Sequence, residues 1–579
     1  MKVQTIQLHN FRSIQDLNVA LDDYSLLVGE NNTGKTALLS AVRTFYEEGG
    51  AKSTRDIDFP KFPTDDNESW IEIAYRTTDE EQETLKTEYR STDRRLRVRR
   101  YFQSDNKDLV KANQSNIYGY ENGTLSTSLF YGAKNVSQAK LGSVLYIPEV
   151  NRSDDALKLS GPSPFRDMVN FVMRRAVLDS QSFGDLHTAF TTFNEQFKEE
   201  ASTDGFSVSS LIEDINREVA HWKICFGVDV NPLRPEDIVR TLLTHYIEDE
   251  NLDGKRVSLG SYGQGLQRHL IYTLIRLSAR FVEPRAEKRK EFAPDFTLIL
   301  FEEPEAFLHP SQQERLNASL RTLATEPTQQ ILITTHSPRF VSKQVSELTS
   351  IIRLQKTAAV TERFQLTGDQ LATMLDRNRG LYQRFSNMLQ DPAVSAPLKA
   401  MIRGKGLGET SPGEDPALED EATRSLLWLN AERAALFFAR HVVLCEGPTE
   451  KAMFEYLLDT AWRDLGDRNV YVADALGKFN IHRHMALLSG LGIRHSVLFD
   501  RDGDADIHQV LNDFIAENRT DLTIQIESFP SCLEDFLAIS AAKRRDLKPL
   551  HVLSNLLNGA IATEKITELR QMFDRLLDG

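Results

Sequence analysis

Two sets of residues in this sequence have the spacing that particular chemistries require, and the first is a phosphate-binding loop. Residues 29–36 read Gly-Glu-Asn-Asn-Thr-Gly-Lys-Thr, between an apolar run and a helical pattern. The glycines let backbone N–H groups turn inward, and the helix N-terminus adds a positive dipole end. Lys35 would reach the β- and γ-phosphates of a nucleotide, and the Thr36 hydroxyl would hold Mg²⁺. The alternative is a chance match in which Lys35 is a solvated helix residue.

Acidic residues and a histidine follow two further apolar runs. The run 297–301 ends in Glu302 and Glu303, and the run 331–335 ends in His336. Acidic groups at the carboxyl end of a buried strand face the ligand in a parallel α/β sheet. Glu302 would hold Mg²⁺, and Glu303 would polarise the water that attacks the γ-phosphate. His336 would contact that phosphate; the alternative is a structural histidine at a strand end.

A Ser- and Gly-rich turn at 259–268 opens a helical pattern upstream of this acidic strand end. It contains Ser261 and Gly263. A turn of this kind at a helix start can bind an anion. The signal is weak by itself because many glycine-rich helix starts look alike, but its position favours a role in the same site.

The second set is a group of carboxylates in the last quarter of the chain. Glu446 follows a short apolar run, and Glu450 lies one turn further on. Asp500 and Asp502 follow another apolar run at alternate positions. Carboxylates from two strand ends form a hard oxygen site that suits Mg²⁺ or Mn²⁺.

The alternative for 500–504 (Asp-Arg-Asp-Gly-Asp) is a hydrophilic turn or part of a calcium loop. A calcium-binding EF-hand needs a helix on both sides and a Glu at the end of the loop. Here the preceding segment has strand character and position 511 is Leu, so the calcium loop is excluded. The pairing with Glu446 at a second strand end favours a metal site over a plain turn.

A basic row with an aromatic residue occurs at 94–102. In a strand, four of its side chains would share one face, namely Arg95, Arg97, Arg99 and Tyr101. Such a face could follow a phosphate backbone. A solvated face balanced by nearby acids explains the pattern equally well.

Length and composition are those of an ordinary globular protein with several domains. The chain has 579 residues, 40% hydrophobic and 26% charged, with a net charge of −15. This charge argues against a surface coated by nucleic acid but leaves room for basic patches. The three cysteines lack disulfide or zinc spacing, which favours the reducing cytoplasm. No apolar run approaches a membrane span, and the N-terminus has no secretory signal pattern.

These residues must be positioned by strands and helices, and the sequence pattern predicts an α/β protein. It would have a first domain with mixed sheets and a helical insertion, and a second domain built on a parallel sheet. The predicted parts are a first domain at 1–350 with a helical insertion at about 155–250, a helical and Gly-, Pro- and acid-rich linker at 351–437, and a second domain at 438–579. The insertion is a candidate oligomer contact. The strand at 2–11 is predicted at a sheet edge, and 351–354 as the last strand of the first domain.

The first domain resembles the ATP-binding-cassette (ABC) ATPases of the SMC, Rad50 and RecF kind. The resemblance rests on Asn10, Phe11 and Arg12, the phosphate loop, the turn at 261–265, Glu302, Glu303, His309 and His336. It implies an ATP site formed by Arg12, Gly29, Asn32, Gly34, Lys35, Thr36, Ser261, Gly263, Glu302 and His336. In that family two heads enclose ATP, so Ser261 of one subunit would contact the nucleotide held by Lys35 of another. In two departures, Glu302 replaces the usual Asp, and the turn is not Ser-Gly-Gly-Gln.

The second domain resembles the Toprim domain of topoisomerases, bacterial primases and OLD (overcoming lysogenisation defect) nucleases. The matching residues are Glu446, Gly447, Gly477, Asp500, Asp502, Glu534 and Asp535. An ABC ATPase followed by Toprim is the OLD-family layout, which includes the nuclease subunit of the Gabija antiphage system. The resemblance implies that two metals are bound by Glu446, Glu450, Asp500, Asp502 and Glu534. These metals would activate water and stabilise the leaving oxygen of a phosphodiester. It also implies a late catalytic lysine, for which Lys548 fits better than Lys543; both could equally be surface charges.

Together these features predict an ATP-regulated, metal-dependent DNA endonuclease or nickase. It would be cytoplasmic and homo-oligomeric (dimer or tetramer), use ATP and Mg²⁺ or Mn²⁺, and have no membrane association. An antiphage role follows from the resemblance alone. One alternative is a RecF-like repair protein that binds DNA without cutting it, although such a protein has no use for a hard-metal site. The other is a nucleotide-sensing scaffold that gates a partner, such as a helicase or a retron element.

Overall fold

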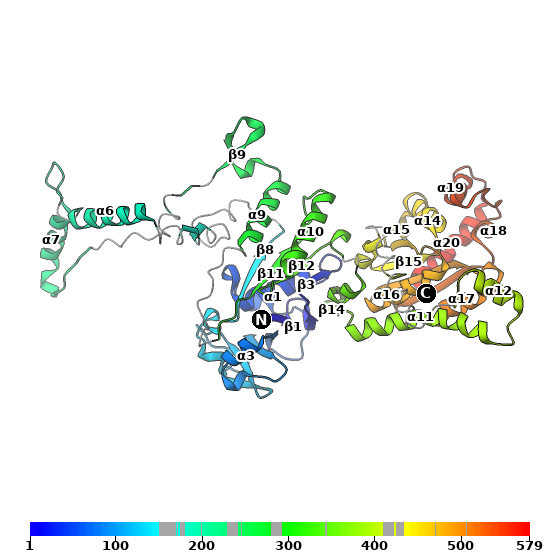
Figure 1. Ribbon diagram of the computed structural model, residues 1–579, viewed down its shortest axis with the longest axis horizontal. Coiled ribbons are helices and arrows are strands. Elements are labelled where there is room, and N and C mark those ends of the chain that lie inside the picture. Colours follow the sequence, from blue (N-terminus) through cyan, green and yellow to red (C-terminus); the bar gives the residue numbers. More distant parts are fainter. Residues whose placement is uncertain are drawn as a thin grey trace. The chain divides into compact units, whose positions relative to one another are not determined.

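The protein is described from a computed structural model (Figure 1). The described residues are 1–149, 169–170, 172–173, 180–197, 200–228, 241, 243–244, 246–278, 292–341, 344–408, 422–423, 433–468, 470–504 and 506–579. They fall into two compact units, one combining 1–149 with 289–579 and the other spanning 150–288.

The first unit opens with an antiparallel sheet. Its strands are β1 (Lys2–Phe11), β2 (Ile14–Ala20), β4 (Ser69–Arg76), β5 (Arg95–Gln103), β6 (Ile117–Glu121) and β7 (Thr124–Leu129), in the spatial order β2-β1-β4-β5-β6-β7. β1 buries alternate residues such as Ile6 and Leu8, and it pairs with β2 on one side and β4 on the other. The prediction of an edge strand was therefore wrong, because alternation reports one buried face and not whether both edges are paired.

A second sheet in this unit carries the phosphate loop. Its strands are β3 (Tyr24–Val28), β8 (Ser143–Ile147), β11 (Thr297–Glu302), β12 (Gln329–Thr334), β13 (Ile351–Thr357) and β14 (Val360–Phe364), in the order β14-β13-β3-β12-β11-β8. All are parallel except β14. β3 is buried throughout, as a central parallel strand must be. Residues 351–354 do form a strand, but β14 follows it, so they are not the last strand of this domain.

One hydrophobic core joins these two sheets. It contains Leu38, Val42 and Phe45 of helix α1 (Lys35–Tyr46), together with Ile6 of β1 and Leu300 of β11. α1 therefore starts directly at the phosphate loop and is fixed by the core behind it. The remaining helices of this part are α2 (Arg55–Asp58), α3 (Asp79–Thr84) and α10 (Pro310–Ala324).

The C-terminal region, in the same unit, has a sheet of four parallel strands. These are β15 (His441–Cys445), β16 (Val470–Asp474), β17 (Arg494–Asp500) and β18 (Thr523–Phe529), in the order β16-β15-β17-β18. The helices of this region are α11 (Gly368–Gln390), α12 (Ala396–Gly404), α14 (Pro448–Thr460), α15 (Arg463–Gly466), α16 (Ile481–Gly490), α17 (Asp506–Glu517), α18 (Leu533–Phe536), α19 (Lys548–Leu557) and α20 (Thr563–Asp578). The predicted parallel sheet is confirmed, and β15 and β17 end side by side.

The second unit contains α6 (Gln181–Phe197), α7 (Val208–Val219), α9 (Gln264–Ser278) and a hairpin of β9 (Ile247–Asp249) and β10 (Lys255–Val257). α6 and α7 fall within the predicted insertion at 155–250, parts of which lie outside the described residues. Most of the acidic linker, 409–421 and 424–432, also lies outside them. Across the described part of the chain, no helix is long and apolar enough to cross a membrane.

Candidate nucleotide and metal sites

The phosphate loop joins β3 to α1 as the sequence predicts. Gly34 precedes the first helical residue, and Lys35 is buried at 6% exposure. The Lys35 Nζ donates to the carbonyl oxygens of Gly29 and Glu30, both at 2.8 Å. Burial lowers the pKa of Lys35 to about 8, against the effect of the surrounding glutamates. The ammonium is therefore held inside the loop by acceptors that phosphate oxygens can replace.

Both glycines of the loop are required by close contacts with the neighbouring hairpin β13–β14. Gly29 has φ +143°, and a Cβ there would lie 2.2 Å from the Leu354 carbonyl oxygen. Gly34 has φ +102°, and a Cβ there would lie 2.5 Å from the Thr361 hydroxyl. Any other residue would have to move the loop or the hairpin.

Thr36 and Glu302, both predicted to hold Mg²⁺, are brought together by the sheet. The Thr36 hydroxyl donates to Glu302 Oε1 at 2.8 Å. The Tyr146 hydroxyl, from the adjacent strand β8, donates to Glu302 Oε2. Tyr146 was not predicted, since only the pairing of β8 with β11 places it here.

Glu303 and His336 also lie together, at the ends of β11 and β12. The His336 Nε2 lies 3.3 Å from Glu303 Oε1. Burial and the Lys35 charge lower the pKa of His336, which favours the neutral ring. Sequence reasoning missed Glu305, whose Oε1 accepts from the backbone N–H groups of His336 and Ser337 and fixes this turn.

Arg12 and Asn32 have different surroundings. Asn32 lies in the loop itself, in the left-handed region with φ +64°. Arg12 forms an ion pair with Asp58 (2.9 Å) and donates to the Ser40 hydroxyl of α1 (3.0 Å). Its contact with a nucleotide stays a prediction.

Ser261 and Gly263 lie in the second unit, in the turn before α9. The Ser261 N–H donates to the Ser258 carbonyl at 3.0 Å, and the Gly263 carbonyl accepts from Leu266 at 3.1 Å. The predicted turn and helix are thus present. Their contact with a nucleotide held by Lys35 stays a prediction.

The C-terminal carboxylates meet at the ends of β15 and β17. Glu446 directly follows β15, and its Oε2 accepts from the backbone N–H of Asp500 at 3.2 Å. The Glu450 carboxylate caps α14 by accepting from the Gly447 N–H at 3.1 Å. Three of the predicted ligands are therefore arranged around one sheet edge.

Burial and mutual repulsion make this carboxylate group costly to keep charged. Burial, with a contribution from Glu446, raises the pKa of Glu450 to about 7. Burial, with repulsion from Glu450, Glu446 and Asp502, raises the pKa of Asp500 to about 8. Perturbed carboxylates of this kind cluster at functional sites.

Asp502 contacts a lysine and a histidine. Its Oδ2 lies 3.0 Å from the Lys478 Nζ and 2.9 Å from the His508 Nδ1. Lys478, 4% exposed, also donates to the Asp500 carbonyl oxygen. Gly477 was named from the sequence as a Toprim match, but Lys478 was given no role, because no local pattern shows where its ammonium reaches.

Glu534 is paired with Lys548, the lysine preferred from the sequence. The Lys548 Nζ lies 2.9 Å from Glu534 Oε1. Despite burial, this pairing lowers the pKa of Glu534. Lys548 also lowers the pKa values of Glu450 and Asp500 in part, so its charge acts on the carboxylate group. Lys543 is exposed.

The donor set at the ends of β15 and β17 suits a divalent cation. Within the described residues, no three His, Cys, Asp or Glu side chains are already arranged to hold a metal ion. The buried Asp500 Oδ1 nevertheless has no hydrogen-bond partner. An unpaired buried carboxylate oxygen beside Glu446 and Glu450 is the donor chemistry that Mg²⁺ and Mn²⁺ prefer.

The basic row at 94–102 is balanced by an acid, in agreement with the interpretation of a solvated strand face with acids nearby. Arg97 and Arg99 both form ion pairs with Glu72 of β4, at 2.6 and 2.8 Å. Glu72 is buried at 2% exposure. These arginines are therefore engaged within the protein.

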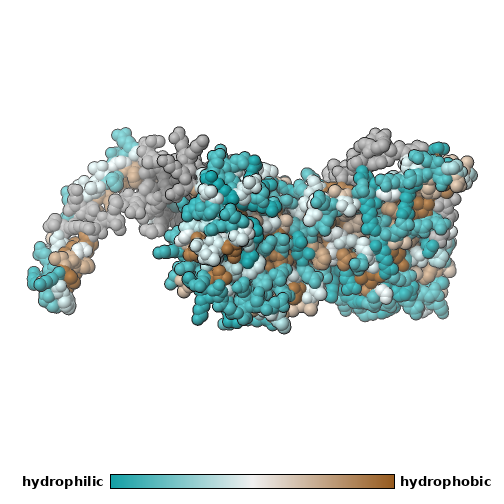
Figure 2. Space-filling view, turned by 90° about the horizontal axis from the view of Figure 1, so that it is seen from below, coloured by the Kyte–Doolittle hydropathy of each residue, from teal (hydrophilic) through white to brown (hydrophobic). Residues whose placement is uncertain are grey.

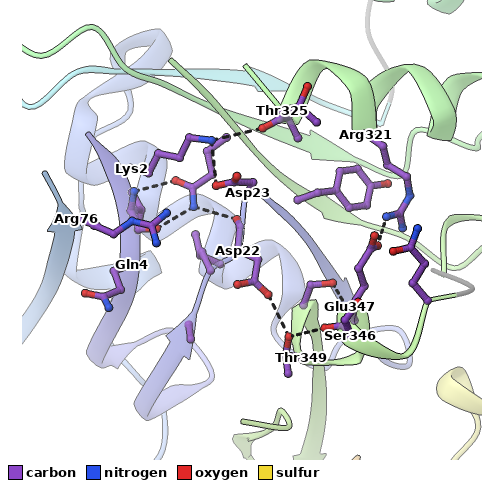
Figure 3. A pocket seen from close by; sticks show the side chains of 18 residues that line it. Lys2, Gln4, Asp22, Asp23, Arg76, Arg321, Thr325, Ser346, Glu347 and Thr349 are labelled. Atoms are coloured by element: carbon purple, nitrogen blue, oxygen red, sulfur yellow. Dashed lines mark hydrogen bonds and ion pairs between the residues drawn. The ribbon is translucent and has the colours of Figure 1, made fainter. Parts of the chain in front are cut away.

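A further cavity of about 760 Å³ lies at the opposite ends of β3 and β12 (Figure 3). Asp22, Asp23 and Lys2 are among the residues that line it. Lys2 pairs with Asp23, and Arg321 pairs with Glu347. These ion pairs join its walls to one another, and we assign it no role.

Comparison with known proteins follows this division of the chain. Residues 25–342 match the family model "AAA domain, putative AbiEii toxin, Type IV TA system", and 437–502 match "Overcoming lysogenization defect protein-like, TOPRIM domain". Endonuclease GajA of Bacillus cereus (strain VD045) is 22% identical over 566 residues, covering 91% of this chain and 81% of the relative. Old nuclease of Escherichia phage P2 is 20% identical over 517 residues, covering 87% and 77%.

Among solved structures, an SMC head domain from Thermotoga maritima covers 63% of this chain and 100% of its own. It is 12% identical, with a TM-score of 0.28. The family assignment depends on the matches that span more than half of the sequence. The chain belongs to the OLD family, with an AAA-type ATPase domain followed by an OLD-like Toprim domain.

Proposed function

We propose that this chain is an ATP-regulated, divalent-metal-dependent DNA endonuclease or nickase that acts in antiphage defence. The observation that carries the proposal is the convergence of Glu446, Glu450 and Asp500 at one edge of the Toprim sheet, with a buried Asp500 oxygen left unpaired. The named relatives, an endonuclease and a nuclease, support the same chemistry. A cytoplasmic location is part of the proposal.

In the Toprim site, Glu446, Glu450 and Asp500 would hold Mg²⁺ or Mn²⁺. The metal supplies a Lewis acid that activates water and stabilises the leaving oxygen of the phosphodiester. Lys478 fixes the end of β17 through the Asp500 carbonyl and holds Asp502 beside it. The Lys548 ammonium lies where it can stabilise negative charge that develops on the phosphate.

In the ATPase site, the proposed roles follow the positions at the carboxyl ends of the parallel strands. Lys35 would bind the β- and γ-phosphates, and Thr36 with Glu302 would hold the Mg²⁺ that accompanies them. Glu303 would orient the attacking water, with neutral His336 beside the γ-phosphate. ATP binding here would regulate cutting at the Toprim site.

The proposed assembly is a homo-oligomer formed by the ATPase domain and its insertion. Large apolar side chains are exposed in the second unit, among them Phe206 (78%), Trp222 (65%) and Leu211 (59%). Figure 2 shows apolar residues at the surface of this part. Several exposed large apolar side chains in one part of the chain support an oligomer contact there. The names of the two relatives given above include no helicase or retron partner, and none is proposed.

A plasmid assay tests the proposed activity. The purified chain is expected to nick or linearise supercoiled plasmid when Mg²⁺ or Mn²⁺ is present and to stop when a chelator removes the metal, because the carboxylates alone cannot activate water. Gel electrophoresis of the plasmid forms, with and without ATP, gives the readout. Equal cutting in excess chelator would exclude a metal-dependent nuclease, and binding without cutting under all metal conditions would favour a RecF-like protein.

The two candidate lysines are expected to behave differently in this assay. Lys548→Met should slow cleavage about 100-fold, the usual cost of losing one group that stabilises a transition-state charge. Lys543→Met is the matched control and should cut like the parent, since Lys543 is exposed. Initial rates of plasmid nicking decide between them. Similar losses in both variants would contradict the assignment of Lys548.

A further inference from the structure

A cavity of about 580 Å³ lies between the phosphate loop and the Toprim domain, within the first unit. Glu30 and Asn31 of the loop and His336 at the end of β12 line it from the ATPase domain. Arg440 and Tyr471 are among the Toprim residues that line it. Lys35 donates to Glu30, and His336 lies beside Glu303, so the cavity borders the end of the site where a γ-phosphate would lie.

The segment that leads to Arg440 is held against the ATPase domain. The Ala439 carbonyl accepts from Arg353 Nη2 at 3.1 Å. Arg353 is 2% exposed and pairs in register with Val28, the last residue of β3 before the phosphate loop. The ring of Phe438 lies 6.4 Å from that of His336. The backbone next to Arg440 is therefore fixed by the same elements that fix the loop.

A second contact of Arg353 lies at the same junction. Arg353 Nη1 donates to the Gly492 carbonyl at 3.1 Å, in the turn before β17. Gly492 has φ +69°, and a Cβ there would lie 2.1 Å from the Phe364 ring at the end of β14. The hairpin β13–β14 thus contacts the phosphate loop on one side and the Toprim domain on the other.

Arg440 itself is exposed and, among the described residues, its side chain makes no hydrogen bond or ion pair. A guanidinium at the edge of a polyphosphate site is suited to bidentate binding of phosphate oxygens. Arg440 also directly precedes β15, a strand of five residues that leads to Glu446. A movement of Arg440 would therefore also move the strand that positions the Glu446 carboxylate.

We propose that Arg440 binds the terminal phosphate of ATP held by the phosphate loop, so that the Toprim domain distinguishes ATP from ADP. This inference rests on the proposed nucleotide site at Lys35. ADP lacks the terminal phosphate and leaves Arg440 without its ligand. The nucleotide state is thereby passed along β15 to the Toprim carboxylates.

The test measures nucleotide affinity on the purified full-length chain, which separates it from DNA cleavage. Arg440→Ala is expected to weaken binding of a non-hydrolysable ATP analogue about 10-fold, as the loss of a charged hydrogen bond requires, and to leave ADP affinity unchanged. Arg440→Lys should recover part of the difference because it keeps the charge. The matched control is Arg494→Ala, an exposed arginine at the first position of β17 that does not line the cavity.

The ratio of plasmid cleavage with and without ATP gives a second readout. It is expected to move toward one in Arg440→Ala and to stay at the parent value in Arg494→Ala. If the parent binds both nucleotides and Arg440→Ala keeps the parent's ratio of ATP-analogue to ADP affinity, the proposal for Arg440 is wrong and the nucleotide site stands. If the parent binds neither nucleotide, the proposed ATP site and the role of Arg440 fail together.

Discussion

Asp500→Asn is expected to reduce metal-dependent plasmid cleavage about 10³-fold, because a metal stabilises transition-state charge by several kcal/mol and each roughly 1.4 kcal/mol is a factor of ten. The substitution keeps the size of the side chain and removes one carboxylate oxygen. One of the two carboxylate oxygens of Asp500 is Oδ1, the buried acceptor that has no hydrogen-bond partner. A metal bound at this edge of the sheet would lose a charged ligand.

The same substitution is expected to leave the metal-free protein as stable as the parent or more stable. Asp500 is surrounded by Glu446, Glu450 and Asp502, and burial together with their repulsion raises its pKa to about 8. At neutral pH a carboxyl with this pKa takes up a proton when the protein folds, which costs stability. A neutral amide avoids that cost and creates no cavity. Functional sites commonly hold such unfavourable charge, and neutralising it trades activity for stability.

Thermal unfolding with and without metal separates these two effects. Mg²⁺ or Mn²⁺ should raise the Tm of the parent, since a ligand that binds only the native state stabilises it, and should leave the Tm of Asp500→Asn unchanged. The matched control is Asp513→Asn, an exposed acid on α17, which should keep both the metal shift and cleavage. Undiminished cutting by Asp500→Asn would show that the carboxylates at β15 and β17 are not the nuclease site.

The parts of both sites that are local in the sequence could be predicted from it. A strand, a glycine-rich loop and a helix are encoded by neighbouring residues, so the surroundings of Lys35 followed directly. Glu302, Glu446 and Asp500 were placed by the rule that carboxyl ends of parallel strands meet at one edge. The structure confirms the parallel sheets on which that rule depends.

Contacts from distant parts of the chain could not be predicted. Tyr146 reaches Glu302 only because β8 pairs with β11. The whole insertion lies between these two strands in the sequence. Lys478 follows a turn with no periodic signal, yet its ammonium contacts Asp502. Arg353 stands in an apolar strand, and it donates to the backbone carbonyls of Ala439 and Gly492, which lie far away in the sequence.

The basic row shows the same limit. Its alternation was evident, but its function depended on which residue faced Arg97 and Arg99. The answer, Glu72, lies on β4, which pairs with β5 in a register that the sequence alone does not specify. The sequence pattern therefore predicted the strand, whereas the strand pairing determined which residues its side chains contact.

Lys35→Ala is expected to weaken ATP binding about 100-fold, because a hydrogen bond to a charged group is worth roughly 1.5–3 kcal/mol and Lys35 would bind two phosphates. The Lys35 ammonium now satisfies the Gly29 and Glu30 carbonyl oxygens at 2.8 Å. Both carbonyl oxygens can accept hydrogen bonds from water when the ammonium is lost, so the loop should stay folded. Equilibrium binding of a fluorescent ATP analogue measures the loss, with Lys61→Ala, an exposed lysine of the same domain, as the matched control.

The strongest use of Lys35→Ala is its combination with Asp500→Asn. If the chain holds two separate pockets, Lys35→Ala keeps the metal-dependent rise in Tm and loses the response of cleavage to ATP, whereas Asp500→Asn keeps ATP binding and loses cleavage. The contacts of Arg353 with Ala439 and Gly492 join the domains and involve neither Lys35 nor Asp500, so neither substitution should unfold the other site. Loss of the metal shift in Lys35→Ala, or of ATP binding in Asp500→Asn, would mean that the two pockets do not form independently. Regulation would then have to be described as a single cooperative site rather than as a signal passing from one domain to the other.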